Sequence, residues 1–195
     1  MLLHFDGHIV GLGTTSGTRV VIGIWSDSPF GHFADAMVEH ACGHRTLLAP
    51  DDDVADLVAS TYTFDEVRIV PVSTSGWSID AGPLRASWEP DGRAPVGHLL
   101  RLVPRPVAQA RTWARWCDPL ARLVMPGVST YGSAGHGRTE WYAARDAWHV
   151  RSARVSWDGD DLGPLADVDP PVRFGFGSAP RRPTLTRLSS FVHLP

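Results

Sequence analysis

Short runs of β-branched and aromatic residues, separated by turn signals, constrain the fold of this chain more than any other feature. His8–Leu12 and Thr18–Trp25 are two such runs, and the polar, glycine-rich segment 13–17 joins them. Runs of this kind, bounded by Gly, Pro, Asp and Ser, are typical of strands connected by tight turns. The pattern predicts a sheet that begins with a hairpin.

The same pattern continues along most of the chain. Further strands are predicted at 33–40, 44–50, 67–72, 77–81, 84–88, 128–131, 139–150, 153–157, 172–177 and 184–193. A helix is predicted over about 52–61, because Val54, Leu57 and Val58 fall on one helical face and acids precede them. So many short strands favour an antiparallel barrel or a sandwich.

Residues 96–126 differ from the rest of the chain, because their pattern predicts helices and not strands. Ala108–Trp116 predicts one helix, and Asp118-Pro119 predicts the start of another, with Asp as the N-cap and Pro at the first helical position. The second helix is expected to end at Pro126-Gly127. We expect two or three short helices in this segment, which carries five arginines (101, 105, 111, 115 and 122) and one Asp.

The predicted fold class is therefore mainly β, a barrel-like antiparallel domain with a short helical insertion. A length of 195 residues fits one domain that buries its own core. We expect a single domain over 1–195, made of a β part (1–95), the helical insertion (96–126) and a second β part (127–195). No repeat or long linker divides it.

Composition narrows the classes of partner and compartment. A net charge of −3 gives no basic excess for nucleic acid binding, and no apolar run reaches the roughly 20 residues that span a bilayer. The N-terminus has no signal-peptide pattern, and Cys42 and Cys117 lie outside zinc-ligand spacings. We expect a cytoplasmic protein with two free thiols, no metal and no integral membrane association.

The chain contains no lysine, and all 18 of its basic residues are arginine. It therefore cannot form a Schiff base through a lysine amine, and it lacks the lysine of a phosphate-binding loop. We expect no cofactor.

Two local motifs favour turns over ligand sites. Gly11, Gly13 and Gly17 resemble a phosphate loop, but a strand follows them where a dinucleotide site needs a helix. His40 and His44 have metal-ligand spacing, but a glycine between them indicates a hairpin tip. A nucleotide and a metal site remain the alternatives at these two places.

The segment 138–146 is the strongest candidate for a ligand site. In a strand, Arg138, Glu140 and Tyr142 project to one face and apolar side chains project to the other. Facing inward, this polar trio would be costly to bury without a ligand or partners. Facing outward, it is an ordinary solvated sheet face.

Three more residues could line the same cavity. His32 and Asp35 lie beside aromatic residues after a turn, and Arg173 is a cation in an apolar run. The alternative for Arg173 is a charge on an edge strand. A cavity holding Arg138 and Arg173 would favour a carboxylate, which guanidinium groups bind in a fork. His32 or Glu140 could then act as acid or base.

The chain resembles an uncharacterised protein family of GC-rich bacteria in several stretches: 15–21, 28–31, 59–67 and 169–176. It is also similar in layout to the acetoacetate decarboxylase-like superfamily, with a short helix after Pro50 and the turn Trp157–Gly163 before the closing strands. That resemblance implies a β-barrel around a buried cavity of keto-acid size. The family's catalytic lysine has no counterpart here, so its decarboxylation mechanism does not transfer.

These observations predict a small-molecule-binding β-barrel whose ligand is apolar or carries a carboxylate. One alternative is a non-catalytic interaction module that uses Trp113 and Trp116 of the helical segment. Another is a lyase or cyclase that uses Glu140, Tyr142 and Arg138. The arginine-rich helices could cover the barrel mouth as a lid or dock on an anionic lipid surface. A homo-oligomer is left open.

Overall fold

The computed structural model describes residues 1–124, 128–133, 137–175 and 179–194. It confirms the predicted fold class, a mainly β chain with a few short helices. The strands before the helical segment are β1 (Leu2–Thr14), β2 (Arg19–Asp27), β3 (Phe33–Glu39), β4 (Arg45–Ala49), β5 (Glu66–Ile69), β6 (Val72–Thr74), β7 (Ser78–Ala81) and β8 (Leu84–Arg93). Those after it are β9 (Tyr131–Ser133), β10 (Thr139–Trp157), β11 (Asp160–Asp161), β12 (Leu165–Ala166) and β13 (Thr184–His193).

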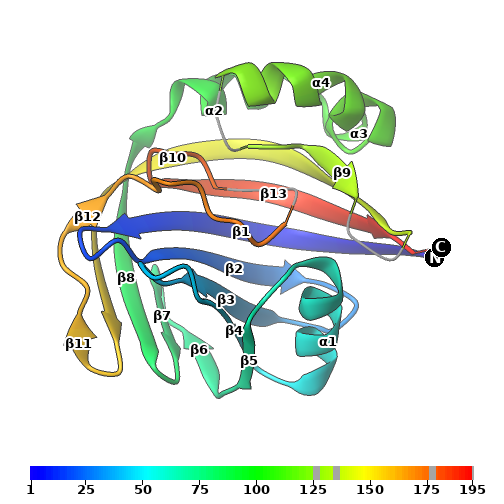
Figure 1. Cartoon of the computed structure of the whole chain (residues 1–195). Helices are drawn as coiled ribbons and strands as arrows, with labels where there is room; N and C mark the ends of the chain where they lie inside the picture. The colour runs from blue at the N-terminus through cyan, green and yellow to red at the C-terminus, as the bar shows by residue number, and fades with distance from the viewer. Residues whose placement is uncertain (125–127, 134–136, 176–178, 195) are drawn as a thin grey trace.

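These strands form one sheet in the order β5-β4-β3-β2-β1-β13-β10-β8-β7-β6, which curls into a half-barrel (Figure 1). Neighbours along this path are antiparallel except β4 and β5, which run parallel with α1 (Asp52–Thr61) between them in the chain. The two strands predicted at 139–150 and 153–157 are one strand. Register shifts around Val150 bend β10, which lets it follow the curl without ending.

The main core follows from the alternation of side chains along the strands. Alternate residues of β1 and β2, Val10 and Leu12 on β1 and Val20 and Ile22 on β2, belong to this core. Residues from β7, β8 and β10 close over them as the sheet curls. The residues between these core positions belong to the opposite face, which holds the candidate site.

Helix α1 forms as predicted. The Asp51 carboxylate accepts a hydrogen bond from the Val54 amide (2.9 Å), which caps the first turn. Val54, Ala55 and Val58 are buried against Leu47 of β4 and its neighbours. Packing of this face holds α1 against the end of the sheet that carries β4 and β5 (Figure 1).

Three helices, α2 (Pro95–Leu100), α3 (Arg105–Ala108) and α4 (Arg111–Val124), pack against β10. Figure 1 shows α4 as a long helix along one side of the molecule. The predicted helix start at Asp118-Pro119 is wrong, because α4 runs through it. Pro119 is exposed, so water can hydrate the carbonyl that its ring deprives of a partner. The predicted end at Pro126-Gly127 lies outside the described residues.

The carboxylate of Asp118 serves another segment instead of capping a helix. It accepts hydrogen bonds from the Thr130 amide (2.8 Å) and the Ser129 hydroxyl (2.7 Å), and Arg122 donates to it from the next turn (2.7 Å). Burial would raise the pKa of Asp118, but these hydrogen bonds outweigh it and lower that pKa. Asp118 thus ties α4 to the approach to β9.

The strand predicted at 172–177 is also wrong over its described part, because residues 172–175 form no strand; the remainder lies outside the described residues. Val172 and Phe174 are buried against Val21 of the sheet, so packing explains their apolar character. In the described part of the chain, no helix is long and apolar enough to cross a membrane.

Candidate functional site

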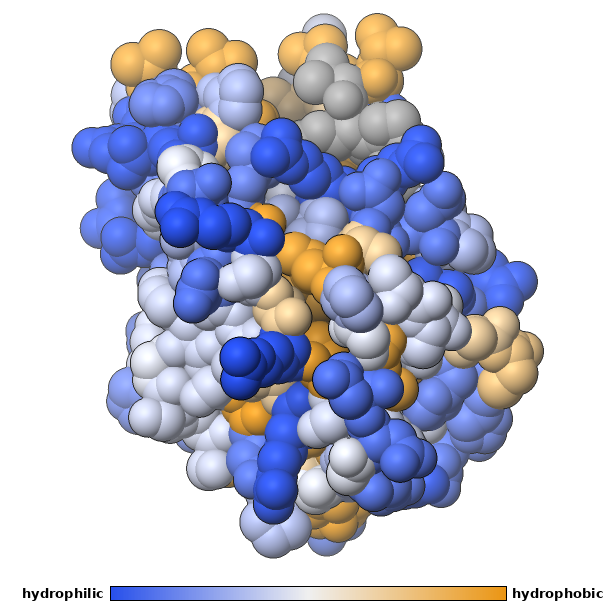
Figure 2. Space-filling view, turned by 90° about the vertical axis from the view of Figure 1, so that its left-hand side faces the viewer, coloured by the Kyte–Doolittle hydropathy of each residue, from blue (hydrophilic) through white to orange (hydrophobic). Residues whose placement is uncertain are grey.

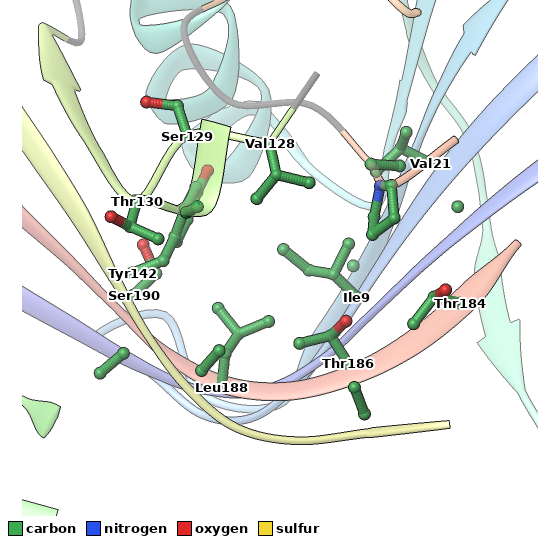
Figure 3. Close-up of a pocket in the computed structure, with 18 of the residues that line it drawn as sticks. Ile9, Val21, Val128, Ser129, Thr130, Tyr142, Thr184, Thr186, Leu188 and Ser190 are labelled. Atoms are coloured by element: carbon green, nitrogen blue, oxygen red, sulfur yellow. The ribbon is translucent and has the colours of Figure 1, made fainter. Parts of the chain in front are cut away.

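A cavity of about 710 Å³ lies on the face opposite the main core. Its walls come from the sheet, from α1, from the helical segment and from residues 172–174 and 179–182, and they are mostly apolar. Small-molecule sites have this character and volume. Figure 3 shows Ile9, Thr186 and Leu188 pointing into the space from the sheet, with Val128 facing them from the other side.

Glu140, at the start of β10, is the central polar group of this cavity. Its side chain is buried, with 4% of the residue exposed. Its Oε1 accepts a hydrogen bond from the Ser190 hydroxyl of β13 (2.8 Å), and its Oε2 accepts one from the Tyr62 hydroxyl (2.9 Å). The Tyr62 hydroxyl also hydrogen-bonds the Tyr142 hydroxyl. The four side chains form one network on the cavity wall.

Burial dominates the acid–base properties of this network. Desolvation raises the pKa of Glu140 to about 7, although the hydrogen bonds from Ser190, Tyr62 and Tyr142 act in the opposite direction. Burial, together with the charge of Glu140, also raises the pKa values of Tyr62 and Tyr142 well above their usual value. Near neutral pH the phenols therefore stay protonated, while Glu140 can hold or release a proton.

The loop after α1 brings Tyr62 to this network from far away in the chain. The Tyr62 amide donates to the Val58 carbonyl (2.9 Å), so the residue caps the helix C-terminus. A Cβ at Gly175 would lie 2.6 Å from Cδ1 of the Tyr62 ring. Glycine at 175 therefore leaves the space that the ring occupies.

Asp35 of β3 is a second buried acid that lines the cavity. Burial raises its pKa to about 7, and a hydrogen bond from the Trp25 indole (Nε1 to Oδ1, 3.1 Å) opposes the rise. Asp35 lies opposite Gly23 in the register of β2 and β3. A Cβ at Gly23 would lie 2.6 Å from Asp35 Oδ1 and 2.7 Å from Trp25 Nε1, so glycine is needed where this hydrogen bond passes.

Of the six predicted site residues, the structure brings Glu140, Tyr142 and Asp35 to the cavity wall. The other three lie elsewhere. His32 is exposed in the turn before β3. Arg138 donates a hydrogen bond to the Ser60 hydroxyl of α1. Of the polar trio, Glu140 and Tyr142 therefore line the cavity, whereas Arg138 binds α1 beside it.

Arg173 binds a different buried acid, Glu39 at the end of β3. Its Nε and Nη2 donate to Glu39 Oε1 (3.1 and 3.0 Å), and its amide donates to Oε2 (2.8 Å). Arg19, directly opposite Glu39 on β2, adds an ion pair at 2.8 Å. Arg173 is thus a partner of a structural ion cluster, and the idea of a carboxylate fork with Arg138 has no support from the geometry.

Sequence reasoning missed Tyr62 and Ser190. Both enter the site from segments distant in the chain, and neither stands in a motif that signals chemistry. A cluster of His, Cys, Asp and Glu suited to a metal ion is not found among the described residues. Cationic character on the wall comes from Arg181 and Arg182, and Arg181 is paired with Asp167 and Asp169.

Comparisons of the chain with family models, with curated proteins and with solved structures found no match. The resemblances described from the sequence therefore stay predictions. The cavity and its polar network are therefore the features from which a function can be inferred.

Proposed function

We propose that this protein binds a small, mainly apolar molecule in the cavity and orients it by a hydrogen bond to Glu140. The observation that carries the proposal is a buried carboxyl group on an apolar cavity wall, with only neutral hydrogen-bond donors as partners. Burying such a group costs free energy. A fold that places it on a cavity wall is better explained by a ligand than by stability.

The chemistry of the wall narrows the ligand class. The carboxyl groups of Glu140 and Asp35 both face the cavity, so a ligand carboxylate near them would meet like charge. A hydroxyl, carbonyl or amino group can pair with Glu140 in one of its two protonation states. The ligand we propose is therefore an apolar alcohol, ketone or amine, and a carboxylate binds more weakly.

A fluorescent apolar probe, 1-aminoanthracene, tests this directly. We expect it to bind the full chain and to be displaced by an alcohol, a ketone and an amine of one chain length more readily than by the matching carboxylate. Thr186 points into the cavity (Figure 3), so Thr186→Phe should weaken probe binding at least about tenfold. Thr186→Val has nearly the same volume and is the matched control.

Glu140→Gln tests the orienting role. It should weaken displacement by the amine about tenfold, because an uncharged amide replaces a carboxylate. Glu89→Gln is the matched control, since Glu89 is exposed on β8. Probe binding that Thr186→Phe leaves unchanged, or no probe binding by the wild-type chain, would contradict the proposal.

A second candidate function follows from the pair of buried acids. With two carboxyl groups whose pKa values are about 7, one can be protonated while the other is ionised. Asp35 as carboxylate would take a proton from the carbon next to a bound ketone. The electron pair of that C–H bond would move to the carbonyl oxygen, which accepts a hydrogen bond from protonated Glu140. Reprotonation of the carbon restores Asp35.

Deuterium exchange separates this candidate from simple binding. A ketone that displaces the probe should exchange its α-hydrogens with D₂O in the presence of the protein, as followed by proton NMR. Asp35→Asn should abolish the exchange while probe binding persists. Exchange at the uncatalysed rate with the wild-type chain would eliminate the catalytic candidate and leave binding as the function.

A further inference from the structure

The helical segment carries most of the strongly exposed large hydrophobic side chains of the described chain. We define the helical patch as Leu99, Leu102, Trp116, Leu120 and Leu123, whose exposed fractions lie between 63% and 83%. Apart from Met1, no other large hydrophobic side chain in the described residues is so exposed. In Figure 2, hydrophobic side chains project from the top of the molecule, where the helices lie. Several large hydrophobic side chains this exposed on one segment are typical of an interaction surface.

The segment that carries the helical patch is positively charged. Five arginines of the same segment are all exposed: Arg101, Arg105, Arg111, Arg115 and Arg122. The one acid in residues 95–124, Asp118, is already paired with Arg122. The segment thus carries a net charge of +4 in a chain whose net charge is −3. This charge is local, and it favours an anionic partner.

Cations and apolar groups also alternate closely. Arg101 precedes Leu102, Arg115 precedes Trp116 and Arg122 precedes Leu123. At a bilayer surface, leucine side chains enter the acyl boundary, tryptophan lies at headgroup depth and long arginine side chains reach the phosphates. A helix with these three kinds of residue on its exposed side has the composition of an interfacial helix.

The helical patch is continuous with the cavity. Leu99 and Leu120 belong to the patch and also line the cavity, and Trp113 beside them lines it and is partly exposed. Side chains that are both cavity-lining and well exposed lie at its mouth. Whatever covers the patch therefore covers an entrance to the apolar space.

We propose that the helical patch docks on an anionic lipid bilayer and turns the cavity mouth toward it. This inference rests on the proposed function, because it gives an apolar ligand a route from the bilayer into the cavity that avoids water. The bilayer is favoured over a protein partner by the positive charge and by the arginines that precede three of the five patch residues, Leu102, Trp116 and Leu123. A second copy of the chain would bring two positively charged surfaces together.

Co-sedimentation of the full chain with vesicles tests the proposal. We expect binding to vesicles of phosphatidylcholine mixed with phosphatidylglycerol, and much weaker binding to phosphatidylcholine alone. Trp116→Ser should lower the partition coefficient about tenfold, because a large apolar side chain no longer leaves water. Trp77→Ser is the matched control, since Trp77 is exposed on the turn between β6 and β7.

Charge variants test the electrostatic part. Arg115→Gln should weaken binding to the anionic vesicles about fivefold, since one arginine near such a surface contributes about 1 kcal/mol. Arg85→Gln, at an exposed arginine of β8, should have little effect. Added salt should weaken wild-type binding.

Three results would overturn the docking proposal. One is equal binding to neutral and anionic vesicles; another is no binding to either. The third is a dimer in size-exclusion chromatography that Trp116→Ser dissociates, which would assign the patch to a second copy. Retained 1-aminoanthracene binding in any of these cases would leave the proposed function standing, whereas loss of probe binding alone would contradict that function and not the docking.

Discussion

Glu39 and Glu140 are both buried, and they differ in what surrounds them. Glu39, with no exposed surface, accepts hydrogen bonds and ion pairs from two arginines. Glu140 is nearly as buried, but its hydrogen-bond donors are a serine and two tyrosines, all neutral. The first carboxylate is compensated by charge, and the second is not. Only the second faces the cavity.

The difference separates a structural acid from one that is available for chemistry. A carboxylate held by guanidinium groups has its negative charge compensated and its oxygens occupied by charged donors. A carboxyl group held by neutral donors on an apolar wall gains or loses its proton near neutral pH. The same residue type thus supports the sheet in one place and the cavity chemistry in the other, and each role can be tested by the same substitution.

Glu39→Gln should have the largest effect on stability. It leaves the guanidinium of Arg19, whose side chain is 5% exposed, without its counter-charge. Breaking a buried pair by removing one partner costs about 3–5 kcal/mol. Urea unfolding at neutral pH measures the loss. Arg173→Gln is a graded comparison: the Arg173 side chain is 70% exposed, so water replaces part of what it donates. A Glu39→Gln protein as stable as wild type would remove the structural role.

Glu140→Gln should change the pH dependence of stability. Because the folded pKa of Glu140 is raised from 4.5 to about 7, its stabilising contribution is complete below 4.5 and is lost as the pH rises through 7. The shift corresponds to about 3 kcal/mol over that interval. Without this carboxyl group, the decline in unfolding free energy between pH 4.5 and 7 should become shallower.

Asp35 also contributes to the pH dependence of the unfolding free energy, because burial raises its pKa as it raises that of Glu140. Asp35→Asn should remove a second part of the decline, and the two variants together should remove more than either alone. Glu89→Gln, at an exposed position, should reproduce the wild-type slope. A Glu140→Gln slope equal to that of wild type would contradict a raised pKa at Glu140.

The sequence predicted most of the strands and α1 because their signals are local. The strand predicted at 128–131 is wrong over 128–130, since β9 begins at Tyr131. Alternation along β1 and β2 and the acids before Val54 depend on neighbouring residues only. Local signals also misled: Asp118-Pro119 has the form of a helix start, yet the Asp118 carboxylate binds the distant Thr130 amide. The run at 172–175 is apolar because it packs against the sheet. The spacing of its apolar residues alone cannot distinguish such a packed segment from a strand.

The candidate site was predictable only in part, for the same reason. Glu140 and Tyr142 lie two residues apart on one strand, so their shared face could be predicted from alternation. Tyr62 meets Glu140 across 78 residues of sequence, and Ser190 meets it across 50. The partners of Arg138 and Arg173, Ser60 and Glu39, are equally remote. No local pattern could tell which cation would reach the cavity.

Gly23→Ala tests whether Asp35, the second buried acid of the cavity, depends on close packing around its hydrogen bond to Trp25. The new methyl group would overlap both atoms of the Trp25–Asp35 hydrogen bond. Overpacking of this kind costs about 1–3 kcal/mol. Gly92→Ala, where nothing lies within 4 Å of the added Cβ, is the control. Equal unfolding midpoints in urea for the two variants would show that the Asp35 site accommodates an added methyl group without loss of stability.

Tyr62→Phe makes the smallest change and bears most closely on the neutral environment of Glu140. Removing the hydroxyl deletes one hydrogen bond to the carboxylate, which costs about 1 kcal/mol. Because that hydrogen bond lowers the pKa of Glu140, its loss should raise this pKa further. Carbon-13 labelling of the glutamate carboxyls reports it directly, since the chain has only four Glu. Tyr131→Phe, whose hydroxyl binds Arg111, is the control. A fall in the Glu140 pKa in Tyr62→Phe would contradict this expectation, because it would mean that the substitution exposes the carboxyl group to water. The contrast between Glu140 and Glu39 would then depend on solvent access and not on whether their donors are charged.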